Sequence, residues 1–193
     1  TVDSKINLNV NGESIIYIVN QNIENLVINM KDNSKLDIYI YNVCKLKYIE
    51  INQNSNSSIN FNYSYVNYED NYLEVVNNIK KDNNKTNILI KNISNNGLSS
   101  IVVKANINKS SKDNYLSESV KGIITHGYIE IDPIIVCDSN EVEANHSATI
   151  SGVDIKQVNY LMSKGLSEKL SNELVMNGFI KSNMDDYIKE FYN

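Results

Sequence analysis

The sequence predicts a mainly β protein that carries a small α-helical appendage at its C-terminal end. From residue 23 to about residue 107, short segments alternate β-branched or aromatic residues with polar ones, which is typical of half-buried strands. Behind Gly152 the apolar residues recur at every third or fourth position, the spacing of amphipathic helices. We therefore expect a β region over residues 1–152 and a helical region over residues 153–193.

The β region is a series of short strand-like segments separated by clusters of Asn, Asp and Ser. In one of them the side chains of Ile59, Phe61, Tyr63 and Tyr65 fall on a single face, and the intervening residues are polar. Several short strands at regular spacing fit a sandwich, a barrel or a solenoid. The segments are 23–30, 35–43, 46–54, 58–66, 72–79, 86–93 and 99–107.

The turn residues favour the solenoid among these three architectures. Tight two-residue hairpins prefer Asn-Gly, because type I′ turns need positive φ at both central positions. Within the β region this dipeptide occurs only at Asn11-Gly12 and at Asn96-Gly97. We therefore predict a β-helix from about residue 10 to residue 150, with predominantly parallel strand pairing.

Three short helices are predicted in the C-terminal region. Asp154 and Gln157 form a capping-box-like start, and a Lys-Gly pair ending at Gly165 closes the first helix. Ser167 can cap the second helix and Asn183 the third. The apolar positions are Ile155, Val158, Leu161 and Met162 in the first helix, Leu170, Leu174, Val175 and Phe179 in the second, and Tyr187, Ile188 and Phe191 in the third.

The charge balance argues against nucleic acid as a partner. The chain has 18 basic residues, all of them Lys, against 23 Asp and Glu, and its net charge is −5. Without a basic stripe or any guanidinium group it has little with which to bind phosphates. No apolar run reaches the ~18 residues of a membrane span, and the N-terminus does not resemble a signal peptide, so we expect a cytoplasmic protein without membrane contact. Cys44 and Cys137 stand in apolar surroundings and are expected to be buried small hydrophobic residues.

No familiar catalytic motif is present, so the sequence predicts a protein that is not an enzyme. Cys137 with His126 and His146 could supply a thiolate–imidazole metal site, although their spacing fits no established motif and a structural role is the alternative. Glu130 and Asp132 alternate on one strand and should share a solvated face.

Residues 127–179, which include the stretch EANHSATISGVDIKQVNYLMSKG, closely resemble the C-terminal signature of the SufB/SufD family of iron–sulfur cluster assembly proteins. The signature combines an acidic strand, a His followed by Ala-Thr, a helix-capping Asp and a closing Gly-Phe. Its matching elements are Glu130, Pro133, Glu141-Val142, His146, Ala148-Thr149, Asp154, Gln157, Tyr160-Leu161, Lys164-Gly165 and Gly178-Phe179.

This resemblance implies a right-handed parallel β-helix followed by a small helical domain. It also implies pairing through the last β-strands, with a transient iron–sulfur cluster at the subunit interface. His146 and Cys137 are then the candidate metal ligands, and Glu130 and Pro133 join them at the interface. The helices would dock a SufC-like ABC ATPase, through Tyr160, Leu161, Lys164, Gly165, Leu174 and Phe179.

Two departures place the chain closer to the SufD branch. The SufB branch has a Glu directly behind the histidine and a Cys on an earlier coil, whereas this chain has Ser147 and, approximately, Ser117 at those positions. The resulting hypothesis is a non-catalytic scaffold that pairs with itself or with a SufB-like partner. The alternatives are a secreted or surface β-solenoid that binds or cleaves carbohydrate with paired carboxylates and tyrosines, and a degenerate homologue that retains only the fold.

Overall fold

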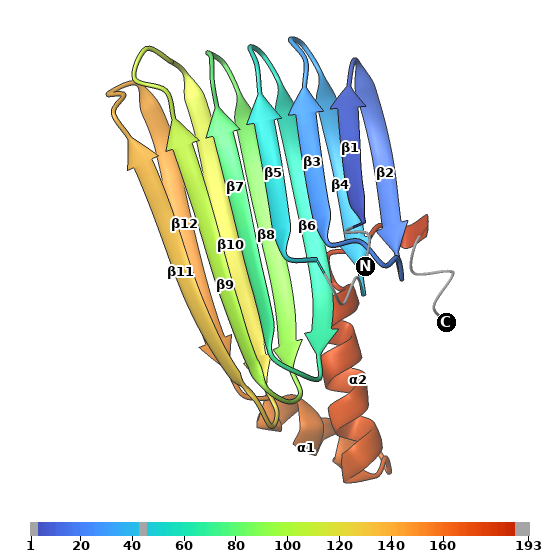
Figure 1. The fold of residues 1–193 in the computed structure, drawn as a ribbon. Helices are drawn as coiled ribbons and strands as arrows, with labels where there is room; N and C mark the ends of the chain where they lie inside the picture. The colour runs from blue at the N-terminus through green and yellow to red at the C-terminus, as the bar shows by residue number, and fades with distance from the viewer. Residues whose placement is uncertain (1–3, 43–45, 188–193) are drawn as a thin grey trace.

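The chain folds as a parallel β-solenoid that is followed by two C-terminal helices (Figure 1). The computed structural model describes residues 4–42 and 46–187. In that part of the chain, successive strands alternate between two six-stranded sheets, one ordered β1-β3-β5-β7-β9-β11 and the other β12-β10-β8-β6-β4-β2. The strands are β1 (Lys5–Val10), β2 (Glu13–Val19), β3 (Asn25–Met30), β4 (Lys35–Tyr41), β5 (Tyr48–Gln53), β6 (Ser58–Asn67), β7 (Asn71–Ile79), β8 (Lys85–Ser94), β9 (Leu98–Ile107), β10 (Asn114–Ile124), β11 (Tyr128–Cys137) and β12 (Val142–Ser151).

The strand pairing confirms the predicted architecture. Each of the seven predicted segments is a strand, β3 to β9, and all pairings between the described strands are parallel. The two Asn-Gly dipeptides do not form hairpins. Gly12, at φ +82, lies between β1 and β2, and Gly97, at φ +75, lies between β8 and β9, so each turn carries the chain from one sheet to the other.

Asparagine makes most of the remaining corners. Asn33, Asn56 and Asn83 adopt positive φ, a conformation that Asn tolerates better than other non-glycine residues, and Asp113 continues the series. The backbone N–H groups of these three asparagines each donate to a carbonyl of the next coil, at 3.0 Å. The Asn-rich separators in the sequence are therefore corners stacked upon one another.

The inward side chains of the strands fill the lumen between the two sheets. Ile59, Phe61, Tyr63 and Tyr65 are all buried, as their alternation predicts. The rings of Tyr63 and Tyr65 stack with their centroids 4.7 Å apart. Burying a column of β-branched and aromatic side chains in each coil is the main stabilising contribution in such a fold.

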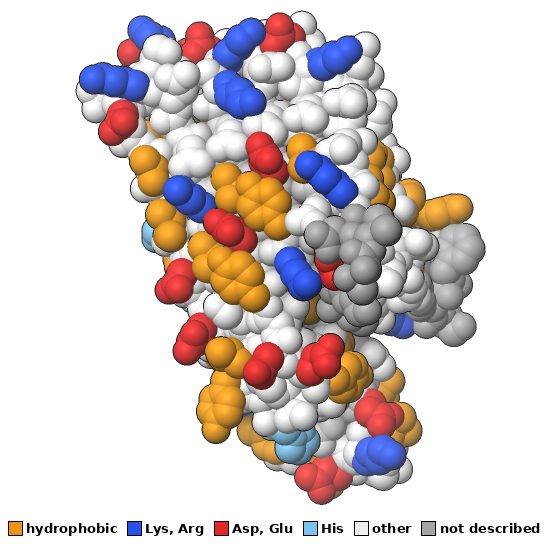
Figure 2. Space-filling model, in the orientation of Figure 1, with side chains coloured by type: hydrophobic (Ala, Val, Ile, Leu, Met, Phe, Trp, Pro, Cys, Tyr) orange, Lys and Arg blue, Asp and Glu red, His pale blue; other side chains and the backbone are white. Residues whose placement is uncertain are grey.

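Outward asparagines form hydrogen-bonded ladders along the sheets. In the odd-numbered sheet the side-chain NH₂ group of each ladder asparagine donates to the side-chain oxygen of the asparagine one coil earlier, at 2.9–3.2 Å. Figure 2 shows the face turned to the viewer as largely uncharged side chains and backbone, with scattered Lys, Asp and Glu and separate hydrophobic side chains. The distance along the sequence between successive members grows from 20 to 28 residues, so the coils widen toward the C-terminal end. The ladder consists of Asn9, Asn29, Asn52, Asn78 and Asn106.

The first two predicted helices are present as α1 (Ile155–Ser163) and α2 (Glu168–Lys181). The carboxylate of Asp154 accepts hydrogen bonds from the backbone of Lys156 and Gln157, and Ser167 accepts one from the backbone of Leu170, as the capping signals predict. The third prediction falls largely on residues 188–193, which lie outside the described residues.

Helix α2 lies against the outer face of the even-numbered sheet, next to β6 and β8. Lys91 of β8 reaches its C-terminal end, donating hydrogen bonds to the carbonyl of Phe179, at 3.0 Å, and to the hydroxyl of Ser182. Farther along, the Tyr17 hydroxyl donates to the carboxylate of Asp185 at 2.6 Å. In the part of the chain that the structure describes, neither helix is long and apolar enough to cross a membrane.

Candidate functional site at the open end

The last coil of the solenoid leaves one end of the lumen uncovered. β11 and β12 each pair with a described strand on one side only, β9 and β10 respectively, and they form the outermost edge in Figure 1. We call this edge the open end. Ile150, on the lumen side of β12, is 44% exposed, and Ile134 and Val136 are exposed on the outer face of β11. The open end therefore combines unpaired backbone edges with uncovered apolar side chains.

One column of inward residues changes its chemistry at this end. Through the first four coils the column is apolar, and its second-last and last members are a carboxylic acid and an imidazole. The register-matched members are Ile16, Ile38, Phe61, Ile88, Glu118 and His146.

Glu118 is buried inside this column, with 2% of its surface exposed. It lies between the buried residues Leu116 and Val120 of β10, and both carboxyl oxygens lack a hydrogen-bond partner in the described residues. Burial raises the pKa of Glu118 from 4.5 to about 7, because the apolar lumen disfavours the charged form. Glu118 is not among the residues predicted from the sequence, although LSESV places it on the same face as Leu116 and Val120.

The four residues predicted at the interface all lie on the last strands. His146 is exposed on β12, next to Glu118 in the register. On β11, Glu130 and Asp132 share the exposed outer face, while Pro133 is half-buried on the lumen side.

The expectation of a buried cysteine is wrong for Cys137, which is exposed. Its strand is the last of its sheet among the described residues, and within them no further coil covers its side chain. Its thiol donates to the carbonyl of Ser139 at 3.3 Å, and its register partner is Ile107. Cys44 lies outside the described residues.

The predicted metal ligands do not form a complete site. His126 lies in the corner between β10 and β11, where it lines a cavity together with α2. It is not part of the column that contains His146. In the described part of the chain, no three His, Cys, Asp or Glu side chains come together as a metal-binding group. An iron–sulfur cluster, which prefers several thiolates, would need ligands from outside these residues.

The predicted docking residues gather around α1 and α2. Leu161, Leu174 and Phe179 line a cavity of about 620 Å³ between the two helices and the end of β12. Tyr160 is exposed, and the Lys164 ammonium lies 5.3 Å from the centre of its ring. Gly165, at φ +94, ends α1 in the left-handed conformation that the Lys-Gly pair predicts.

The members of this set differ in how firmly they contact the solenoid. Phe179 is half-buried in a cluster with Ile93 and Ile123, and the Lys91 ammonium lies 5.2 Å from the centre of its ring. Leu174 is 43% exposed, and Leu170 one turn earlier is similarly exposed. Leu170 and Leu174 therefore leave apolar surface exposed, whereas much of the Phe179 side chain packs against the solenoid.

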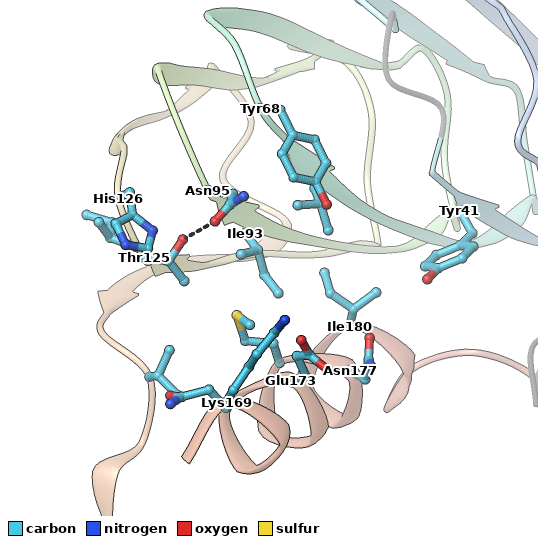
Figure 3. A pocket seen from close by; sticks show the side chains of 15 residues that line it. Tyr41, Tyr68, Ile93, Asn95, Thr125, His126, Lys169, Glu173, Asn177 and Ile180 are labelled. Atoms are coloured by element: carbon cyan, nitrogen blue, oxygen red, sulfur yellow. Dashed lines mark hydrogen bonds between the residues drawn. The ribbon is translucent and has the colours of Figure 1, made fainter. Parts of the chain in front are cut away.

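A second cavity, of about 790 Å³, separates α2 from the strand ends and corners of the solenoid (Figure 3). Ile93 and Ile180 contribute apolar surface, and Lys169 and Glu173 extend into it from α2. On the opposite side the hydroxyl of Thr125 donates to the side-chain oxygen of Asn95 at 2.9 Å. Its polar groups are mixed in charge and do not converge on one point.

Comparison with known proteins assigns the second half of the chain. The sequence model of the family described as SUF system FeS cluster assembly, SufBD core domain, matches residues 75–179. This range runs from within β7 to the last turn of α2, so it contains both the open end and the two-helix cavity.

Three curated relatives are similar over shorter stretches. The iron–sulfur cluster assembly protein SufD of Bacillus subtilis is 35% identical over 77 residues, which are 40% of this chain and 16% of that protein. A SufBD-family protein of Pyrococcus horikoshii is 30% identical over 80 residues, covering 35% of this chain and 18% of its own. A SufBD-family protein of Methanocaldococcus jannaschii is 38% identical over 64 residues, with shares of 33% and 19%. The chain thus matches less than a fifth of the length of each relative.

Proposed function

This chain belongs to the SufBD family of the SUF iron–sulfur assembly system, and on that premise we propose that it is a non-catalytic scaffold subunit of a cluster assembly complex in the cytoplasm. The observation that carries the proposal is the extent of the family match over residues 75–179. The matched range joins an uncovered sheet edge and an exposed helical surface in one unit. A protein with two such surfaces can hold two partners at a fixed distance, which is what a scaffold must do.

The first surface is the open end, through which we propose that the chain pairs with a SufB-like subunit or with a second copy of itself. Its support is the row of unpaired backbone groups on β11 and β12 and the uncovered lumen-side residue Ile150 of β12. A second solenoid end would satisfy these groups and bury the apolar column ends. A cluster assembled there would be cargo, and groups from both subunits would bind it.

The second surface is the pair of helices, through which we propose that the chain docks a SufC-like ABC ATPase. Leu170 and Leu174 are exposed on α2, and Tyr160 is exposed on α1. Neighbouring apolar side chains on a helix are the usual anchors when a helix packs into a groove of a partner. Leu174, which also lines the two-helix cavity, replaces Phe179 as the first choice of anchor.

Co-purification tests the docking step. Leu174→Asp places a charge in the proposed contact and should abolish capture of the cognate ABC ATPase, while the melting temperature stays within about 2 °C because the side chain is already exposed. Ile15→Asp is the matched control, since Ile15 is exposed on β2 at the opposite end of the solenoid. Equal capture by both variants would refute docking through these helices.

Light scattering tests the pairing step. Ile150→Lys puts a charge on the lumen side of the open end and should turn the dimer, or the complex with a SufB-like subunit, into separate chains. Ile15→Lys again serves as the control. If the wild-type chain stays monomeric both alone and with the SufB-like subunit, pairing through the open end is excluded. Docking of the ABC ATPase is tested separately, by the co-purification experiment.

A further inference from the structure

A three-residue pattern recurs on the outer face of the odd-numbered sheet. A tyrosine, an apolar residue and a glutamate follow one another at the starts of β5 and β11 and near the start of β7, and nowhere else in the chain. In each copy the apolar residue is buried in the lumen, so the tyrosine and the glutamate both stand on the outer face. The copies are Tyr48-Ile49-Glu50, Tyr72-Leu73-Glu74 and Tyr128-Ile129-Glu130.

The strand register sets these copies in a diagonal row. Tyr48 is the register partner of Glu74, so this carboxylate has one tyrosine on the neighbouring strand and another, Tyr72, on its own. The hydroxyl of Tyr72 donates to it at 3.4 Å. With about 4.8 Å between strands and about 3.3 Å per residue, the row from Tyr48 to Tyr128 is about 20 Å long. An extended peptide of about six residues has this length.

Ser100 of β9 leaves a notch in the middle of the row. It is the register partner of Tyr72 on one side and of Glu130 on the other. The tyrosine and the glutamate therefore stand two strands apart, about 9.6 Å in the backbone, with only a hydroxymethyl group between them. Tyr72 is 50% exposed, and Glu130 is also exposed. A cation over Ser100 can lie within about 6 Å of the ring centre and within about 4 Å of the carboxylate.

The charge of this face favours a cationic partner. The outer faces of β5, β7, β9 and β11 carry Glu50, Glu74, Glu130 and Asp132 against one basic residue, Lys104. Within residues 4–42 and 46–187, no ion pair joins any of these side chains to another residue. Figure 2 shows acidic side chains next to hydrophobic ones on this face. Nucleic acid would be repelled here, and a second copy of the same face would bring the same charge.

Carbohydrate suits the face less well than a cation does. Sugar hydroxyl groups need both donors and acceptors, whereas ionised carboxylates only accept hydrogen bonds. The side-chain NH₂ groups of the neighbouring ladder, at Asn52, Asn78 and Asn106, already donate to other asparagines.

We propose that this outer face binds a lysine- or arginine-bearing segment of a partner protein in an extended conformation. The cations of the segment lie on the tyrosine rings and pair with the glutamates, and the central cation lies over Ser100. The inference does not rest on the scaffold function, because it uses neither Ile150 nor the two helices. Pairing along the edge of β11 would leave the outer face of that strand uncovered.

Fluorescence anisotropy with a short labelled peptide of alternating arginine and serine tests this surface on the full chain. The wild type should bind one peptide saturably, and the affinity should fall as salt is added. Glu74→Gln combined with Glu130→Gln should weaken binding at least tenfold. The matched control is Glu13→Gln combined with Glu143→Gln, which removes two exposed carboxylates from β2 and β12 of the other sheet and should leave the affinity within about twofold.

Two substitutions at Tyr72 separate recognition by the ring from attraction by charge. Tyr72→Ala should weaken binding several-fold, whereas Tyr72→Phe keeps the ring and should bind like the wild type. Melting curves confirm that each variant is folded, as expected for exposed positions. No saturable binding of the peptide, equal losses in the two double variants, or an unchanged affinity in Tyr72→Ala would each overturn the inference. Binding of cellohexaose in place of the peptide would assign the face to carbohydrate and would overturn it as well.

Discussion

In the middle of the solenoid the column through Phe61 continues in both directions with isoleucine, whereas two coils later the same column holds Glu118 and three coils later His146. The backbone is the same in both places: extended, parallel and in register. The middle position has a covered coil on either side, and the last position has one on a single side. The difference shows that the interior of this fold is specified by the presence or absence of a neighbouring coil as much as by the alternation within a strand.

The largest difference in stability should appear between Phe61→Ala and His146→Ala, two substitutions in one column. Phe61 is fully buried, so its truncation leaves a cavity and should lower the free energy of unfolding by about 3–5 kcal/mol. His146 is exposed, and its truncation should change the free energy of unfolding by no more than about 0.5 kcal/mol. Urea denaturation of both variants measures the contrast, and similar losses would show that the last coil is covered in solution.

Glu118→Gln should stabilise the protein at pH 8. The folded chain holds the Glu118 proton up to about pH 7, and the unfolded chain releases it near pH 4.5. The folded state therefore binds more protons between these values, so wild-type stability falls as the pH rises through this window and is level above it. The difference in pKa corresponds to about 3 kcal/mol, which the variant should recover at pH 8.

Melting curves from pH 4 to pH 8 check the sign of this effect. The wild type should lose stability relative to Glu118→Gln across the window, and the two should converge at its acidic end. Parallel curves at all pH values would mean that Glu118 is charged and paired in solution.

Lys91→Met should loosen α2 from the solenoid. The substitution keeps the apolar stem but removes the hydrogen bonds to Phe179 and Ser182, at an expected cost of about 1–2 kcal/mol. Hydrogen exchange of the α2 amides should accelerate, while the lumen strands stay protected. The control is Lys121→Met, because Lys121 is the exposed register neighbour of Lys91. Burial lowers the pKa of Lys91 to about 8, and repulsion from Lys121 adds to this shift. Faster α2 exchange in the control alone would contradict this account.

The smallest effect is expected for Asp154→Ala at the start of α1. Losing the cap that binds the backbone of Lys156 and Gln157 should cost about 1 kcal/mol, confined to that helix. Amide exchange in the first turn of α1 measures it, with the exposed Lys156→Ala as the control. A loss spread over the solenoid would show that α1 is part of the folding core.

The parts of this structure that depend on neighbours in sequence were predictable. Alternation placed Phe61 and its companions inside, and the caps at Asp154 and Ser167 start their helices as expected. The features that depend on position along the axis were not predictable: Cys137 reads as a buried residue in a strand, and its exposure results from that strand being the last.

The candidate site was half predictable for a related reason. His146 stands out by type, and the resemblance to a family marked it. Glu118 is inconspicuous in sequence, because a Glu among serines suggests a surface strand. Only the register between β10 and β12, set by the length of a whole coil, brings Glu118 next to His146.

The asparagine ladders also bear on the open end, through electrostatics. In the ladder of the odd-numbered sheet Asn29, Asn52, Asn78 and Asn106 each donate toward the N-terminal coils, so their carbonyl oxygens point the other way, and Asn106 ends the row. In the even-numbered sheet Asn60 and Asn87 donate in the same sense. Oriented side-chain amides contribute fixed partial charges, and rows aligned in this way add their dipoles. The negative poles of both rows face the last coil, where their field attracts cations, so the ladders that align the coils also polarise the solenoid along its axis.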